Sequence, residues 1–175
     1  FVPARQGLLG DVATDASAPR SGHIGRRRLE ARLTAASEGR LTLVVAGAGY
    51  GKTTLLRSWP APVPVAWHTI SPADRVPGVL ARHIVDALRL RVPDLSADLV
   101  VAASGLRGQD ADDIGQAEAS AAALAEALGA PLRRSTALVL DDVHEIESVA
   151  EASRFVAALS RQLAGSLNLV LVSRD

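Results

Sequence analysis

Short apolar runs alternate along this chain with longer segments in which apolar residues recur every three or four positions. The short runs predict strands at residues 41–46, 65–70, 137–140 and 167–172. The longer segments predict helices at residues 26–37, 52–59, 79–90, 96–103, 111–128 and 149–163. The regular alternation predicts an α/β fold of three layers, in which a mainly parallel sheet is flanked by helices on both faces.

Two features of this pattern refine the predicted fold. The first strand, LTLVVA at 41–46, is apolar at nearly every position, which is typical of a strand buried on both faces of a parallel sheet. The segment SPAD at 71–74 has the residues of a helix start and precedes the helix predicted at 79–90. Residues 1–22 show no apolar periodicity, so we expect a flexible lead-in or linker there and one core domain over residues 23–175.

Composition agrees with a single aliphatic domain. A chain of 175 residues can bury about 70% of the surface of its unfolded form. Apolar residues make up 48% of the chain but aromatic residues only 3%, so Leu, Val, Ile and Ala must build the core. There is no cysteine, which excludes disulfides and thiolate chemistry. No segment resembles a signal peptide or a membrane span, and we therefore expect a soluble, cytoplasmic protein without membrane contact.

The charge pattern gives no indication of a nucleic-acid or zinc site. The 19 basic and 19 acidic residues cancel, so no net field attracts the chain to DNA or RNA. The Arg triplet at 26–28 is close to Glu30 and is interpreted as a solvated helix face. The spacing of His68, His83 and His144 is unlike that of zinc ligands, and no zinc site is expected.

A glycine-rich segment between the first strand and the following helix carries the clearest chemistry. The sequence AGAGYGKTT at 46–54 matches the phosphate-binding P-loop pattern except for Ala46 at the first Gly position. Its Lys52 is the only lysine of the chain, all other basic residues being Arg. Gly49 and Gly51 allow backbone N–H groups to surround phosphate oxygens, Lys52 would reach the β and γ phosphates, and Thr53 would bind Mg²⁺. The expected nucleotide contacts are Ala48, Gly49, Tyr50, Gly51, Lys52, Thr53 and Thr54.

Two later strands end in residues that complete such a site. LVLDD at 138–142 is interpreted as a Walker B motif, in which Asp141 holds Mg²⁺ and Asp142 orients the attacking water. An Asp is shorter than the Glu of faster ATPases, so slow hydrolysis is expected. Arg174 follows the last strand, at the end where parallel sheets bind ligands, and could sense the γ-phosphate. Lys52, Asp142 and Arg174 are therefore the predicted catalytic residues.

Three segments together resemble a known family. AGYGKTTLL at 48–56, LVLDDVH at 138–144 and LVLVSR at 169–174 are similar to the signatures of signal-transduction ATPases with numerous domains, specifically the large LuxR-type regulators related to the maltose-regulon activator. The P-loops of that group commonly start with Ala, as at Ala46. HIGR at 23–26 with Glu30 resembles a segment whose backbone contacts adenine, which implies nucleotide contacts at Ile24, Gly25 and Arg26.

The resemblance covers residues 22–175 and implies a switch controlled by ATP and ADP. Nucleotide-dependent self-association and contacts with the other domains of a parent regulator are implied with it. The resemblance further implies that the family's lid, winged-helix, sensor and DNA-binding domains are absent from these 175 residues, and that the core would be cut after its fourth strand. Two alternatives stay open at this point: a self-contained P-loop enzyme such as a small-molecule kinase, and a module that binds nucleotide without turnover.

Overall fold

A computed structural model of the chain describes residues 26–39, 41–92, 95, 113–129, 132, 136–163 and 167–174. The predicted lead-in and the helix predicted at 96–103 lie outside these residues. No helix in the described part of the chain combines the length and the apolar character needed to cross a membrane.

The centre of the fold is a four-stranded sheet in which all neighbours are parallel. Its strands are β1 (Leu41–Val45), β2 (Val65–Thr69), β3 (Thr136–Asp141) and β4 (Leu167–Ser173). They are arranged in the order β1-β4-β3-β2, so β1 pairs with the strand farthest from it in sequence. Val45 is opposite Ser173 and Thr69 is opposite Asp141. The carboxyl ends of all four strands therefore meet at one edge of the sheet.

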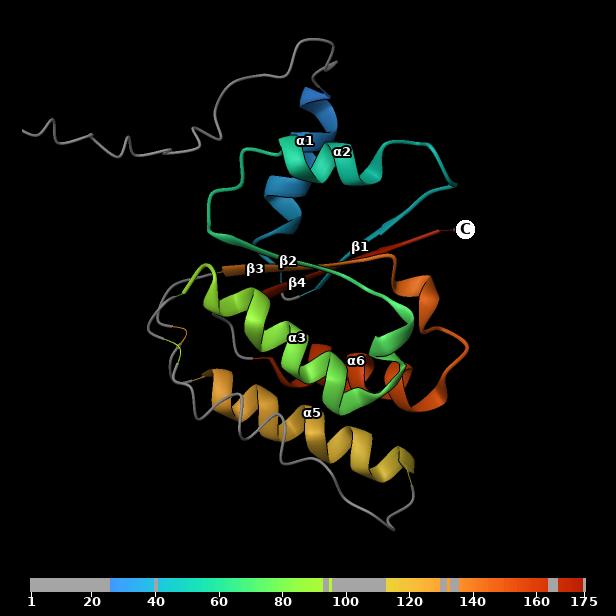
Figure 1. The fold of residues 1–175 in the computed structure, drawn as a ribbon. Coiled ribbons are helices and arrows are strands. Elements are labelled where there is room, and N and C mark those ends of the chain that lie inside the picture. The colour runs from blue at the N-terminus through green and yellow to red at the C-terminus, as the bar shows by residue number, and fades with distance from the viewer. Residues whose placement is uncertain are drawn as a thin grey trace, which may run out of the picture.

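Helices cover both faces of this sheet (Figure 1). The helix α1 (Arg27–Ala36) and the short α2 (Lys52–Ser58) lie on one face, whereas α3 (Pro77–Arg89) and α6 (Ala150–Gln162) lie on the other. The helix α5 (Asp113–Gly129) packs on α6, on the side away from the sheet. Two 3-10 turns follow strands: η1 (Pro72–Arg75) after β2 and η2 (Val143–Glu145) after β3. The three predicted layers are confirmed, with α5 added outside them.

Aliphatic side chains fill two cores, one on each face of the sheet. The larger core joins the sheet to α3, α5 and α6 and includes Leu80, Ile84, Leu138 and Phe155. The smaller core joins the sheet to α1 and α2 through Leu33, Leu55, Leu56, Trp59, Val139, Val170 and Val172. All six residues of β3 are buried, as expected for a strand with neighbours and helices on every side.

The prediction that the first strand is buried on both faces is wrong for the described structure. Leu41, Leu43 and Val45 of β1 are 48%, 63% and 44% exposed. Their neighbours along the strand, Thr42 and Val44, point to the opposite face, where Val44 packs against the smaller core. The cause is the position of β1 at the sheet edge, where no described helix covers the face that carries the three exposed residues.

Candidate nucleotide-binding site

The P-loop joins β1 to α2 and has the backbone conformation that its glycines allow. Gly49 and Gly51 have φ angles of 79° and 74°, in the left-handed region that other residues rarely adopt. Gly51 also forms the N-cap of α2, so the loop turns directly into that helix at Lys52. A Cβ at Gly49 would meet no atom within 4 Å, which shows that backbone conformation, rather than space, favours glycine at this position.

The side chain of Lys52 lies against its own loop. Its ammonium group donates a hydrogen bond to the carbonyl of Gly47 at 3.0 Å and a second one to the carbonyl of Ala46. The positive charge is thereby placed at the entrance of the loop, between the end of β1 and the start of α2. A phosphate group on the loop would offer this ammonium stronger, charged acceptors than the two carbonyls.

Thr53 and Asp141 are 88 positions apart in sequence but in direct contact in space. The hydroxyl of Thr53 donates to Oδ2 of Asp141 at 2.9 Å, and the backbone N–H of Asp142 donates to the other carboxylate oxygen, Oδ1, at 3.0 Å. Asp141 is only 4% exposed, so these two bonds hold a nearly buried carboxylate in one orientation. The P-loop and the predicted Walker B strand thus meet at two oxygen-bearing side chains.

Asp142 has an uncommon backbone conformation that turns the chain away from β3. Its φ of 60° and ψ of 39° lie in the left-handed region, and it is the one described residue other than glycine with positive φ. Asp tolerates this region better than most residues. The carboxylate Oδ1 of Asp142 lies 3.6 Å from Nη2 of Arg174 and 3.8 Å from Nδ1 of His144. Its negative charge therefore faces one fixed cation and one titratable ring.

Arg174 follows β4, which lies between the P-loop strand and the Walker B strand. Half of its side chain is exposed, so its ion pair with Asp142 is reachable from solvent. The preceding residue, Ser173, is buried and donates a hydrogen bond of 2.6 Å to Oε1 of Glu147, in the segment after η2. Sequence analysis did not identify Glu147, because nothing in the spacing of the chain shows that this segment returns to the end of β4.

Arg26 contacts the P-loop from the start of α1. Its Nη1 donates to the carbonyl of Tyr50 at 2.9 Å, and a Cβ added at Gly51 would lie 3.5 Å from its guanidinium. Ala48, Tyr50 and Thr54 are exposed, as residues that contact a ligand on the outside of the loop would be. Ile24 and Gly25, the other two residues predicted near the base, lie outside the described residues.

The residue types at this edge of the sheet fit a phosphate group and a hard divalent cation. Thr53 and Asp141 offer a hydroxyl and a carboxylate oxygen 2.9 Å apart, and oxygen ligands of this kind are what Mg²⁺ binds in proteins. Lys52 and Arg174 add positive charge at the same edge of the sheet, and the loop supplies backbone N–H groups. Asp142 is the one predicted catalytic carboxylate. Its Oδ1 lies 3.6 Å from Nη2 of Arg174, and its backbone N–H donates to the carboxylate of Asp141.

Comparison with known proteins identifies relatives of the same kind as the motifs do. No family model matches the chain. The chain is 32% identical over 153 residues to the HTH-type transcriptional regulator MalT of Cronobacter sakazakii, and 34% identical over 157 residues to MalT of Serratia proteamaculans. These alignments cover 86% and 85% of the chain but only 16% of each relative.

Among solved structures, a Walker-type ATPase of Pyrococcus abyssi aligns with 86% of the chain and 45% of its own, at 13% identity and a TM-score of 0.49. The curated relatives agree with the family resemblance that the motifs carry. The chain is therefore homologous to part of the MalT-type, LuxR-type transcriptional regulators, and it spans about a sixth of their length.

Proposed function

We propose that this chain binds ATP and ADP with Mg²⁺ at the P-loop and acts as a slowly hydrolysing switch within a larger, MalT-like regulator. The observation that carries the proposal is the 2.9 Å contact between Thr53 of the P-loop and Asp141 of the Walker B strand, with Lys52 on the same loop. A glycine-rich loop by itself makes phosphate binding no more than a hypothesis. The contact with a buried carboxylate adds a site for the cation that accompanies the nucleotide.

Each residue has a separate task in this proposal. The loop at Ala48, Gly49, Tyr50 and Gly51 would surround the β-phosphate with N–H groups, and Lys52 would exchange its loop carbonyls for phosphate oxygens. Thr53 and Asp141 would hold Mg²⁺, which supplies charge neutralisation to the phosphates when it is bound. Arg26, which contacts the loop through Tyr50, would lie on the side of the nucleotide base.

The arrangement around Asp142 supports slow turnover and a switch. A carboxylate that orients water must be free to accept its proton, but Asp142 lies within 3.6 Å of the Arg174 guanidinium. A γ-phosphate near Arg174 would compete with Asp142 for this cation, and ADP would leave the pair intact. Because Arg174 would change partner with the nucleotide state, the end of β4 could report that state to the rest of a regulator.

Two other functions are separable by experiment. A small-molecule kinase would transfer phosphate to a metabolite, and a pure binding module would hold nucleotide without releasing phosphate. The purified chain should be assayed for bound nucleotide, ATP binding and phosphate release, beside Lys52→Ala and Asp142→Asn. We expect Lys52→Ala to lose binding and Asp142→Asn to keep binding but lose the slow hydrolysis.

Control variants and the products of the reaction distinguish the switch from the binding module and the kinase. Arg57→Ala is the matched control, because it removes another cation from the same short helix at an exposed position outside the predicted contacts. It should leave Mg²⁺-dependent phosphate release within a few-fold of the wild type. Phosphate release that is absent from the wild type as well as from Asp142→Asn, with binding intact, would favour the binding module. Phosphate transfer to a metabolite in place of water would contradict the switch.

A further inference from the structure

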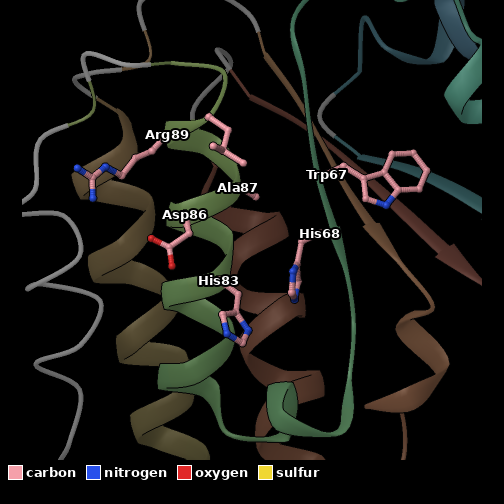
Figure 2. A pocket seen from close by; sticks show the side chains of 7 residues that line it. Trp67, His68, His83, Asp86, Ala87 and Arg89 are labelled. Atoms are coloured by element: carbon pink, nitrogen blue, oxygen red, sulfur yellow. The ribbon is translucent and has the colours of Figure 1, made fainter. Parts of the chain in front are cut away.

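Three side chains that the nucleotide site does not use form a cluster where β2, η1 and α3 meet. His68 on β2, Asp74 in η1 and His83 on α3 lie close together, although 15 positions separate the two histidines. One ligand-type atom from each, a ring nitrogen or a carboxylate oxygen, lies within 4.8 Å of the other two. Figure 2 shows the two imidazoles pointing toward one another from the strand and the helix, while Trp67 points away.

Both imidazoles are directed at the same oxygen atom. Nδ1 of His83 lies 2.7 Å from Oδ1 of Asp74, and Nε2 of His68 lies 3.1 Å from that oxygen. The two rings have centroids 5.1 Å apart and are tilted by 42°. Asp74 is fully buried, whereas the side chains of His68 and His83 are 17% and 29% exposed. The cluster is thus anchored on a buried carboxylate and opens toward solvent at the rings.

The carboxylate is oriented by a second set of bonds. The backbone N–H and the hydroxyl of Ser71 donate to Oδ2 of Asp74 at 2.7 and 2.9 Å, closing the capping box of η1. Burial alone would raise the pKa of Asp74, but the hydrogen bonds from His83 and Ser71 and the nearby His68 together lower it below its ordinary value. Ser71 thus leaves Oδ1 as an anionic acceptor directed at the rings.

A hydrogen-bond network alone does not satisfy this cluster. Nε2 of His68 is buried and has no hydrogen-bond partner in the described structure, although it lies 3.1 Å from Oδ1 of Asp74. Buried polar atoms without a partner are uncommon and call for an explanation such as a bound ion. A cation between the three atoms would use the lone pair of this nitrogen.

The geometry points to a divalent transition-metal site formed by His68 Nε2, Asp74 Oδ1 and His83 Nδ1, with Zn²⁺ as the metal that fits best. Two imidazoles and one carboxylate are a common three-residue zinc ligand set, and they leave a fourth position open. Metal–ligand bonds of about 2.0–2.1 Å at tetrahedral angles place ligand atoms roughly 3.3 Å apart. The distances of 2.7 and 3.1 Å to Asp74 are near this value, so small side-chain movements admit the ion.

His68 and His83 also line a cavity of about 450 Å³ that is open to solvent, together with Asp86, Arg89 and neighbouring residues. Figure 2 shows Asp86 and Arg89 on α3 beside His83, farther along the same helix. The cavity gives the ion a path from solvent, which a usable metal site requires. Ser71 has the role of an outer-shell group that holds the ligating carboxylate in place.

The test is metal titration of the purified, chelator-treated chain without nucleotide, so that its outcome is independent of the proposed ATP site. We expect one Zn²⁺ per chain by calorimetry, and with Co²⁺ a visible absorption band of a four- or five-coordinate ion that Zn²⁺ removes. Ser71→Ala should weaken Zn²⁺ binding by about 10- to 100-fold, because Ser71 holds the ligating carboxylate in place. His68→Gln and His83→Gln each remove a ligand and should weaken Zn²⁺ binding by more than that.

Asp86→Asn is the matched control, because it removes a carboxylate from the same cavity without touching the three ligands. It should change Zn²⁺ affinity by less than about threefold, and circular dichroism should show that each variant is folded. NMR of the wild type needs no substitution: Zn²⁺ should shift the imidazole signals of His68 and His83 together. The proposal would be overturned if the wild type showed no saturable Zn²⁺ binding, or if His68→Gln and His83→Gln bound Zn²⁺ as tightly as the wild type. Wild-type imidazole signals that Zn²⁺ leaves unchanged would also overturn it.

Discussion

The contact between Thr53 and Asp141 can be tested in the nucleotide-free chain, before any question of activity arises. Thr53→Val keeps the shape of the side chain but removes the hydroxyl that donates to Asp141 at 2.9 Å. Asp141 is 4% exposed, so water cannot readily replace the lost donor. A buried acceptor that loses its partner costs about 1–3 kcal/mol, and we expect Thr53→Val to lower the free energy of unfolding by that amount.

A double-mutant cycle separates this bond from other effects of the substitution. The free energy of unfolding would be measured by urea denaturation for the wild type, Thr53→Val, Asp141→Ala and the double variant, without Mg²⁺ or nucleotide. A hydrogen bond to a charged group contributes about 1.5–3 kcal/mol, so a coupling energy of that size is expected. Thr54→Val, at the exposed neighbouring position, should change stability by less than about 0.5 kcal/mol.

The result that would refute the reasoning is equally definite. A coupling energy within about 0.5 kcal/mol of zero would mean that Thr53 and Asp141 act independently. The P-loop and the Walker B strand would then not be in contact in solution, and the cation site inferred from their meeting would have no basis. A large loss of stability in Thr54→Val would equally show that the effect belongs to the helix and not to the bond.

Three further predictions concern the backbone and the core, all measured by urea unfolding. Gly51→Ala, at a φ of 74°, should cost about 1–2 kcal/mol, whereas Gly78→Ala in α3, where φ is not positive, should stabilise by roughly 0.5 kcal/mol; equal effects would contradict the left-handed turn. Asp142→Ala should cost about 1 kcal/mol more than Asp142→Asn, because Asn tolerates φ of 60° and Ala does not; no difference would contradict that conformation. Phe155→Ala should cost about 3–5 kcal/mol, since the ring is fully buried in the larger core, and a cost below 1 kcal/mol would contradict that core.

Local pattern predicted the elements of this fold but not how the strands pair. The apolar runs and the Gly-rich loop place strands and helices within one or two residues of their bounds, because strand and helix periods are local properties. The pairing of β1 with β4 depends on how distant segments pack, and no spacing within either strand encodes it. The exposure of Leu43 follows from that order, because an apolar run does not show whether its strand is central or at an edge.

The two candidate sites also differ in how far the sequence alone could predict them. The P-loop residues and Asp141 were predictable, because each motif is contiguous and follows an apolar strand. The convergence of His68 and His83 on Asp74 was not, because β2, η1 and α3 must first fold to bring the two histidines to one oxygen. Their sequence spacing alone gave no indication of a zinc site, and only the three-dimensional arrangement does.

The central claim is that the chain binds Mg²⁺-ATP through its P-loop, and one titration tests it most directly. Calorimetric titration of the chelator-treated chain with ATP and Mg²⁺ should give one site, and Lys52→Ala should weaken it by at least about tenfold, since charged hydrogen bonds of 1.5–3 kcal/mol are lost. Arg57→Ala, which removes an exposed cation from the same helix, should be titrated in parallel and should stay within a few-fold of the wild type. Wild-type protein that binds no ATP with Mg²⁺, or Lys52→Ala that binds as tightly as the wild type, would contradict the account.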